Sequence, residues 1–189
     1  MKQRTNYGNW VPATILRISY GCTVAFLLLF FFSAFCWNNF WAAVIAGLLA
    51  LAAVVIAVFM QVCHHTFSFN GGGLMGEIHQ FLIDHLDWDG HGTLLDIGCG
   101  AGALTNRCAK QFPEATLQGM DYWGMGWDYA KEQCERNAEI EGVADRVTFS
   151  KGDASKLDFA DESFDAAVSN FVFHEVKTQP DKREVVREA

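Results

Sequence analysis

The sequence predicts a doubly wound α/β domain that follows a pair of membrane-spanning helices. Two observations predict this fold class. The 59 residues from Ile18 to Gly76 contain no Asp, Glu, Lys or Arg, whereas about a quarter of the residues in an ordinary soluble domain are charged. After residue 92, short apolar strands alternate with helical segments, a pattern typical of a parallel sheet with helices on both faces.

Two apolar runs predict the membrane helices. They cover about residues 19–37 and 40–62, and each reaches the ~20 residues that a helix needs to cross the hydrocarbon core. The polar pair Asn38-Asn39 separates them, which predicts a tight helical hairpin. We interpret the small residues of the second run, such as Ala46 and Ala50, as membrane-compatible residues rather than as a packing face.

The basic residues predict the orientation of this hairpin. Lys2, Arg4 and Arg17 precede the first run, and positive residues favour the cytoplasmic side. We therefore expect residues 1–65 to be an anchor integral to the plasma membrane, with the N-terminus and the C-terminal domain in the cytoplasm. A cleaved signal peptide competes with this interpretation, but the first run is too long and a second run follows at once. A buried soluble hairpin is disfavoured because neither run has a polar face.

Composition excludes several other classes. Residues 66–189 contain 11 basic and 22 acidic residues, so this part lacks the basic face that nucleic-acid binding requires. The six cysteines have no metal-ligand spacing, and a disulfide framework does not suit a cytosolic domain. We interpret Cys63-His64-His65 as polar residues at a helix end, because no cluster of partner ligands is visible. The sequence therefore predicts neither a nucleic-acid partner nor a bound metal.

The rest of the chain divides into a linker at 66–76 and an α/β domain at 77–189. Apolar residues at helical spacing predict an amphipathic helix over 74–86. The alternating pattern then predicts, in chain order, a strand at 93–97, a helix at 103–112, a strand at 115–120, a helix at 128–141, strands at 146–150 and 164–169, and a helix from residue 181.

Glycine and polar residues follow each of the four strands. Gly98–Gly102 follows the first strand, and Asp121, Asp153 and Asn170 follow the next three. Ligands of doubly wound sheets bind at the carboxyl ends of the strands. Because four separate loops carry such residues at that edge, the sequence predicts one ligand site there.

The glycine-rich turn allows two ligands. Gly98, Gly100 and Ala103 satisfy the loose dinucleotide pattern, in which a helix N-terminus meets a pyrophosphate. However, Asp96 lies two residues before the first glycine, and a carboxylate there suits a cationic ligand better than a pyrophosphate. Asp121 suits a ribose in either case.

Four stretches carry a resemblance to one family. Leu94–Gly102 resembles motif I of the class I S-adenosylmethionine-dependent methyltransferases, and Gly119–Asp121 is similar to the acid that ends the family's second strand. Lys151–Ala154 is similar to the family's adenine-contacting loop, and Phe159–Asn170 to its fourth strand. The resemblance covers about residues 74–189. It implies a Rossmann-like, mostly parallel sheet and S-adenosyl-L-methionine as the cofactor.

The resemblance also implies roles for individual residues. The glycines pass beneath the methionine part of the cofactor, Asp96 lies near its amino group, and Asp121 accepts hydrogen bonds from both ribose hydroxyls. Asp153 and the Ala154 amide read the adenine edge, beside which Tyr122 or Trp123 stacks. The cofactor-binding set is Asp96, Gly98, Cys99, Gly100, Gly102, Asp121, Tyr122, Asp153, Ala154 and Asn170.

The resemblance says little about the methyl acceptor. Phe171, Val172 and Phe173 suggest an apolar wall, and the segment lacks the Asn-Pro-Pro-aromatic signature of enzymes that methylate nucleic-acid amino groups. We expect a small-molecule or lipid-like acceptor. His174 is the best-placed general base, but we interpret it as a structural histidine and assign no catalytic residue.

Members of the family continue through further strands, so we expect the sheet to be truncated at its C-terminal side, with the fourth strand as an apolar edge. Two other functions compete with a membrane-anchored methyltransferase. One is an anchored cofactor-binding or sensory module without turnover, and the other is a nicotinamide-dependent oxidoreductase.

Overall fold

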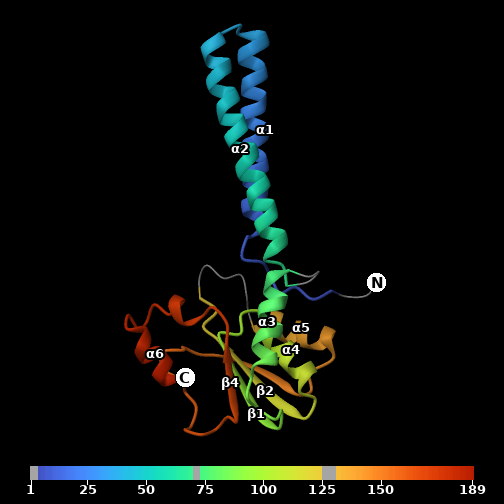
Figure 1. The fold of residues 1–189 in the computed structure, drawn as a ribbon, viewed down its shortest axis with the longest axis vertical. Coiled ribbons are helices and arrows are strands. Elements are labelled where there is room, and N and C mark those ends of the chain that lie inside the picture. Colours follow the sequence, from blue (N-terminus) through green and yellow to red (C-terminus); the bar gives the residue numbers. More distant parts are fainter. Residues whose placement is uncertain (1–3, 70–72, 125–130) are drawn as a thin grey trace. The chain divides into compact units, whose positions relative to one another are not determined.

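A computed structural model describes residues 4–69, 73–124 and 131–189. It divides into two compact units: Asn9–Met75 forms one, and the segment up to Gly8 together with Gly76–Ala189 forms the other (Figure 1). The first unit is a helical hairpin and the second is an α/β domain.

The hairpin consists of two long apolar helices. Helix α1 spans Ala13–Phe31 and continues as a π-helical turn at Phe32–Cys36, and α2 spans Phe40–Thr66. The turn between them is closed by Asn39, whose side chain accepts a hydrogen bond of 3.0 Å from the backbone amide of Ala42. Both helices are long and apolar enough to cross a membrane, and each extends several residues beyond the predicted run.

A stripe of alanines joins the two helices. Ala46, Ala50, Ala53 and Ala57 recur at spacings of four and three residues and are all buried, so they form one face of α2. Between them, a Cβ on Gly47 would lie 3.3 Å from the Phe30 ring of α1. Small residues thus permit close approach of the helices. The interpretation of these residues as merely membrane-compatible is therefore incomplete.

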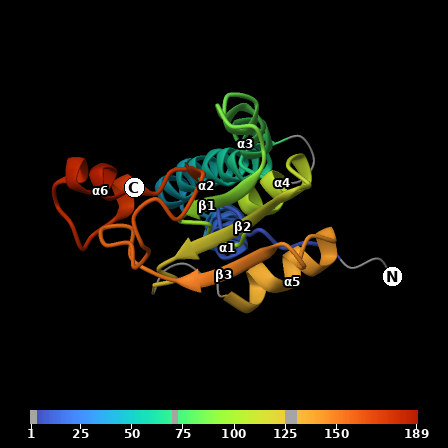
Figure 2. The ribbon, with the colours of Figure 1, turned by 90° about the horizontal axis from the view of Figure 1, so that it is seen from below.

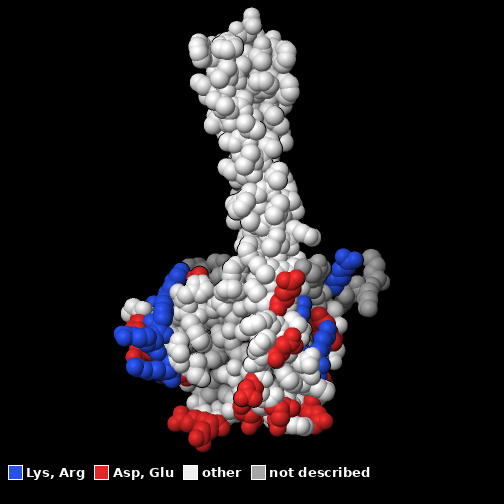
Figure 3. Space-filling view, in the orientation of Figure 1, with Lys and Arg blue, Asp and Glu red and all other residues white. Residues whose placement is uncertain are grey.

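The opposite faces of both helices carry large apolar side chains. Leu28, Phe35 and Trp41 are 65%, 77% and 72% exposed. Arg17 is the one charged residue of Asn9–Met75, and Figure 3 shows charged side chains gathered instead on the α/β domain.

The α/β domain is built on four parallel strands. They are β1 (Gly92–Ile97), β2 (Ala115–Asp121), β3 (Val147–Lys151) and β4 (Ala166–Ser169), in the spatial order β3-β2-β1-β4. The register places Ile97 opposite Met120 on one side and Ser169 on the other. The carboxyl ends of the strands therefore meet at one edge, and the Rossmann-like fold is confirmed.

Each face of the sheet has its own apolar core. Side chains of a strand alternate between the faces, so Leu94 packs with α4 (Ala103–Gln111), α5 (Lys131–Glu141) and Ile83 of α3 (Leu74–Asp84). Leu95 packs instead with Val185 of α6 (Lys182–Glu188) and with partly buried apolar residues after β3 and β4. Figure 2 shows α6 on the other side of the domain from α4 and α5.

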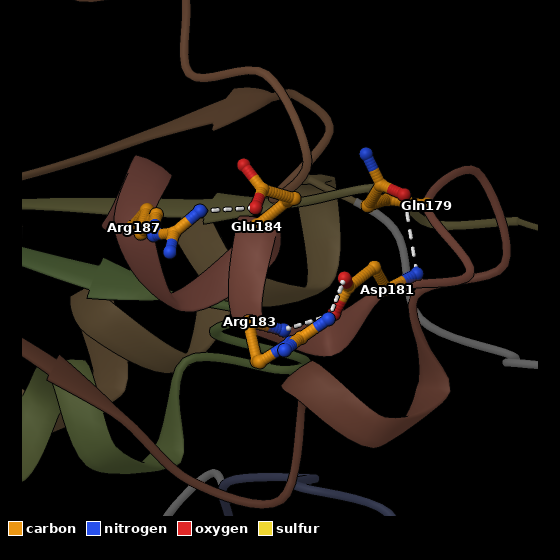
Figure 4. Close-up of polar contacts among 5 residues, drawn as sticks. All are labelled: Gln179, Asp181, Arg183, Glu184 and Arg187. Carbon is orange, nitrogen blue, oxygen red and sulfur yellow. Dashed lines mark hydrogen bonds and ion pairs between the residues drawn. The ribbon is translucent and has the colours of Figure 1, made fainter.

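Helix α6 is fixed at both ends by polar contacts, and Figure 4 shows those that involve Asp181 and Arg183 at its start. The Asp181 side chain caps the helix by accepting a 3.0 Å hydrogen bond from the Arg183 amide, and the Arg183 guanidinium pairs with it at 2.7 Å. At the other end, Glu188 accepts a 2.8 Å hydrogen bond from the backbone of Leu157. These contacts hold the fully buried Val185 against the sheet.

The predicted elements correspond to the observed ones within a few residues. The exception is the helix predicted at 128–141, since α5 begins at Lys131 and residues 128–130 lie outside the described residues. Among the residues that the structure describes, β4 pairs only with β1 and so forms an edge of the sheet.

Candidate functional site

A glycine-rich loop joins β1 to α4 at the carboxyl edge of the sheet. Gly98, Gly100 and Gly102 have φ values of +77°, +59° and +80°, a backbone region that glycine adopts without steric cost. The amides of Gly98 and Cys99 both donate to the Met120 carbonyl, at 2.7 and 3.0 Å. The start of the loop is thereby tied to the end of β2.

The Asp121 carboxylate holds the middle of this loop. One of its oxygens accepts a 2.8 Å hydrogen bond from the Gly100 amide, and the other accepts a 2.8 Å hydrogen bond from the Trp123 amide. The Trp123 indole in turn donates to the Gly100 carbonyl at 2.9 Å. Each carboxylate oxygen has two lone pairs, so Asp121 keeps acceptor capacity for further donors.

Two residues of α5 support the loop from behind. The Cys134 thiol donates to the Gly100 carbonyl at 3.1 Å, and the Asn137 amide donates to the Ala101 carbonyl at 2.9 Å. Cys99 is buried, and its side-chain hydrogen bond with Cys134 together with burial raises the pKa of its thiol. The predicted cofactor residue Cys99 therefore contributes its backbone to the loop surface and its side chain to the interior.

Asp96 lies beneath the loop and is 1% exposed. Its carboxyl accepts a 2.5 Å hydrogen bond from the Thr105 hydroxyl on α4. Burial raises the pKa of Asp96 to about 7, opposed by the Thr105 hydrogen bond and reinforced by the negative charge of Asp121. A cation close to this carboxyl would favour its charged form.

Asp153, after β3, connects two loops. Its Oδ1 accepts hydrogen bonds from the amide and hydroxyl of Ser155, both at 2.8 Å, and from the Thr178 hydroxyl at 2.9 Å. Burial opposes ionisation, but these donors outweigh it and hold the pKa of Asp153 below its usual value. Ala154 beside it is buried. Asp153 therefore fixes the chain segment after β4 next to the loop after β3.

The segment after β4 packs directly on the glycine-rich loop. A Cβ on Gly98 would lie 2.2 Å from the Val172 side chain, so this side chain packs against the Gly98 backbone. Asn170 is partly buried at the end of β4. His174 follows on an exposed turn, where its ring atom Nε2 lies 3.4 Å from Oε1 of Glu175.

The structure thus brings most of the predicted set together at one edge. Gly100 is in direct contact with Asp121, and Asp96 is buried at the end of β1 before the loop. Tyr122 is exposed, with the Lys151 ammonium 5.6 Å from its ring centre. Three residues of the site were not predicted from the sequence: Thr105, which bonds to Asp96, and Cys134 and Asn137, which bond to carbonyls of the loop. A weak signal existed, because Cys134 and Asn137 are polar residues three apart, on one face of a helix.

Comparison with known proteins identifies the family. The family described as "Methyltransferase domain" matches residues 94–189. A sterol 24-C-methyltransferase of Yarrowia lipolytica is 38% identical over 73 residues, which are 39% of this chain and 18% of the relative. The biotin biosynthesis bifunctional protein BioHC of Teredinibacter turnerae is 33% identical over 109 residues, 55% of this chain and 16% of that protein. This chain therefore spans less than a fifth of these two relatives.

One solved structure adds support for the fold. The [4+2]-cyclase SpnF superposes with a TM-score of 0.51 and 26% identity, over 59% of this chain and 38% of that chain. The chain belongs to the methyltransferase domain family. Its fold and its motifs are those of the class I branch, whose cofactor is S-adenosyl-L-methionine.

The residues present fit this cofactor. Gly98 and Gly102 stand where a Cβ would lie 2.2 Å from Val172 and 3.1 Å from Phe149, so the loop keeps its course only with glycine. Asp121 offers free acceptor lone pairs beside the loop, as a ribose with two hydroxyls requires. Asp96 supplies a carboxyl suited to a cationic group.

Two glycines with similar φ values separate backbone strain from crowding. Gly142 has a φ of +74° and nothing within 4 Å of its Cβ position, whereas Gly98 has a φ of +77° and meets Val172. We expect Gly142→Ala to lower the free energy of unfolding by roughly 1–2 kcal/mol. Gly98→Ala should cost roughly 1–3 kcal/mol more through overpacking. Urea unfolding of the full chain in detergent measures both, and equal losses would contradict the close packing of Val172 on the loop.

The buried Asp96 predicts a pH dependence of stability. Its pKa rises from 3.8 in the unfolded chain to about 7 in the folded one, so the folded state holds a proton that the unfolded state releases between these values. The free energy of unfolding should therefore fall as pH rises from about 4 to about 7, by at most roughly 4 kcal/mol. Asp96→Asn removes this contribution. Unfolding measured across that range should show a shallower decline in the variant, and identical slopes would contradict the assignment.

Proposed function

We propose that this chain is a membrane-anchored, S-adenosylmethionine-dependent methyltransferase that transfers a methyl group to a small-molecule or lipid-like acceptor. The observation that carries the proposal is the glycine-rich loop held by Asp121 at the carboxyl edge of a parallel sheet. Membership of the methyltransferase domain family supports the cofactor and the reaction class.

The proposed cofactor contacts follow from this edge. Gly98, Gly100 and Gly102 pass beneath the methionine part, Asp121 accepts from the ribose hydroxyls, and Asp96 offers its charge to the amino group. The residues that complete the proposed site are Cys99 through its backbone, Tyr122, Asp153, the Ala154 amide and Asn170. When bound, the cofactor supplies a methyl group on a sulfonium, which is a good leaving group.

The protein's own contribution to such a reaction is position and the exclusion of water. Asp121 fixes the loop, and Val172 packs on it from the segment after β4. We propose that the reacting centre lies beside these two segments. Alignment and desolvation of this kind supply much of the acceleration in group transfer. A general base is needed only where the acceptor loses a proton, and we assign none, since His174 is exposed and points to Glu175.

A lipid-like acceptor is supported by two features. Apolar side chains line the segment after β4, where Phe171 is 47% exposed and adopts a φ of +57°. A relative with sequence similarity to this chain is named as a sterol methyltransferase, and a sterol is an apolar acceptor. An acceptor dissolved in the bilayer would also explain why the α/β domain is joined to a membrane hairpin.

The hairpin is proposed to be an integral membrane anchor in the plasma membrane, with both of its ends in the cytoplasm. Exposed apolar side chains cover the outer surface of the hairpin, and exposing such a large apolar surface to water is unfavourable. Asn6 and Tyr7, before the hairpin, hydrogen-bond to α5 of the domain that follows it. This contact supports two crossings, because both flanks of the hairpin then lie on one side.

A second function has one observation in its favour. SpnF shares the fold and is named as a [4+2]-cyclase rather than as a methyltransferase. An anchored cofactor-binding module without methyl turnover is therefore the alternative. Transfer of a tritiated methyl group to a membrane lipid extract distinguishes the two.

Replacement of Asp121 tests the cofactor site. Asp121→Ala removes the acceptor for the Gly100 amide and the proposed ribose contacts, so affinity for S-adenosyl-L-homocysteine should fall at least about tenfold, equivalent to about 1.4 kcal/mol. Isothermal titration of the full chain in detergent measures the affinity, with the exposed Asp161→Ala as the matched control. Wild-type affinity in Asp121→Ala would refute the assignment.

Cysteine labelling tests the topology of the anchor. Asn38→Cys places a thiol in the turn between the two helices, and Glu114→Cys places one on the exposed surface of the domain. In a background with Cys22, Cys36 and Cys63 replaced by Ser, a membrane-impermeant maleimide should label Asn38→Cys in intact cells and leave Glu114→Cys unlabelled until the membrane is opened. Labelling of Glu114→Cys in intact cells would place the domain outside.

A further inference from the structure

The segment before the hairpin is built into the α/β domain. We call residues 4–8 the N-terminal strap; in the structure they belong to the same compact unit as Gly76–Ala189. The strap lies about a hundred residues or more away in sequence from its partners on α4 and α5. The strap contacts the domain through the backbone of Asn6 and the side chain of Tyr7.

Asn137 connects the strap to the glycine-rich loop. Its carbonyl oxygen accepts a 2.9 Å hydrogen bond from the Asn6 amide, and its side-chain nitrogen donates to the Asn6 carbonyl, also at 2.9 Å. The same nitrogen donates to the Ala101 carbonyl of the loop at 2.9 Å. Asn137 is fully buried, so losing a partner would leave a polar group unpaired in the interior, which costs about 1–3 kcal/mol.

Tyr7 anchors the strap in place. It is 8% exposed, its hydroxyl donates to a Glu141 carboxylate oxygen at 3.0 Å, and it accepts from the buried Asn106 amide at 3.2 Å. The ring and both hydrogen bonds are satisfied only while the strap is docked. Tyr7 therefore couples the chain before the hairpin to α4 and α5, the two helices that frame the loop.

We propose that the N-terminal strap is a positioning element of the cofactor site. In this proposal Tyr7 docks the strap, the docked Asn6 backbone orients the Asn137 side chain, and Asn137 holds the Ala101 carbonyl and with it the glycine-rich loop. The proposal rests on the proposed function in that the loop is taken to bind S-adenosyl-L-methionine. None of these residues contacts the reacting atoms; they act through the loop.

The proposal makes cofactor affinity depend on a segment outside the canonical strand-end loops. An extension, cleavage or partner that pulls the strap away would loosen the loop without touching it. Only a few residues join the strap to α1. In this proposal, a change at the N-terminus or in the anchor that undocks the strap would therefore lower the affinity for the cofactor.

The test compares two tyrosines of the full chain in detergent. Tyr7→Ala should undock the strap, while Tyr20→Ala removes a tyrosine whose hydroxyl binds Gln61 within the hairpin. Two quantities are measured: the dissociation constant of S-adenosyl-L-homocysteine, and amide hydrogen exchange of peptides that cover residues 98–104 and 115–121. Tyr7→Phe keeps the ring and loses the hydroxyl, and serves as the conservative variant.

We expect Tyr7→Ala to weaken binding about tenfold and to accelerate exchange at 98–104 while exchange at 115–121 stays unchanged. Tyr7→Phe should recover most of the affinity, and Tyr20→Ala should match the wild type. Wild-type affinity and wild-type exchange at 98–104 in Tyr7→Ala would overturn the proposal. If amide exchange in Tyr7→Ala is rapid throughout the domain, this variant has unfolded and Tyr7→Phe provides the test. A two- to threefold weaker affinity in Tyr7→Phe would then support the proposal, and wild-type affinity would overturn it.

Failure of the proposed function would be separate from failure of the strap. If the wild type does not bind S-adenosyl-L-homocysteine, the cofactor assignment is wrong, and exchange at 98–104 alone then decides the positioning role. Faster exchange there in Tyr7→Ala would support it, and unchanged exchange would overturn it.

Discussion

The hydrogen bond from the Gly100 amide to the Asp121 carboxylate is the constraint on which the site depends. It joins the turn after β1 to the end of β2 at 2.8 Å, and the parallel register of the two strands makes this distance possible. A carboxylate that accepts backbone amides is a strong, directional partner. The loop is therefore shaped before any ligand arrives, and the entropy of ordering it is lost in folding rather than in binding.

This arrangement gives the acidic residues of the site different environments. Asp96 is buried under the loop and its pKa is raised to about 7, whereas hydrogen bonds from Ser155 and Thr178 lower the pKa of Asp153. One carboxyl is thus poised to gain charge beside a cation, and the other is fixed as a structural acceptor. The two carboxyls therefore suit different groups: that of Asp96 suits a charged amino group, and that of Asp153 suits a neutral base.

The fold and the position of the candidate site at the carboxyl edge of the sheet could be predicted from the sequence because both depend on local patterns. Alternating apolar strands and helices define the sheet, and Gly98–Gly102 and Asp121 stand at fixed offsets from strand ends. What the sequence did not reveal depends on contacts between distant residues. The Asn6–Asn137 pair is separated by 131 positions, and neither periodicity nor composition links them. The packing role of Ala46 and Ala50 was missed for a related reason, since an alanine stripe suits lipid and a neighbouring helix equally well in sequence.

The most direct test of the account is to find where the cofactor binds. Ultraviolet cross-linking of radiolabelled S-adenosyl-L-methionine to the full chain, followed by tryptic mapping, locates the contact on the sequence. We expect label in the peptide Gln111–Lys131, which contains Asp121 and Tyr122, or in Gly152–Lys156, which contains Asp153. Label found only in other peptides, at a level that excess S-adenosyl-L-homocysteine does not reduce, would contradict this assignment of the cofactor site.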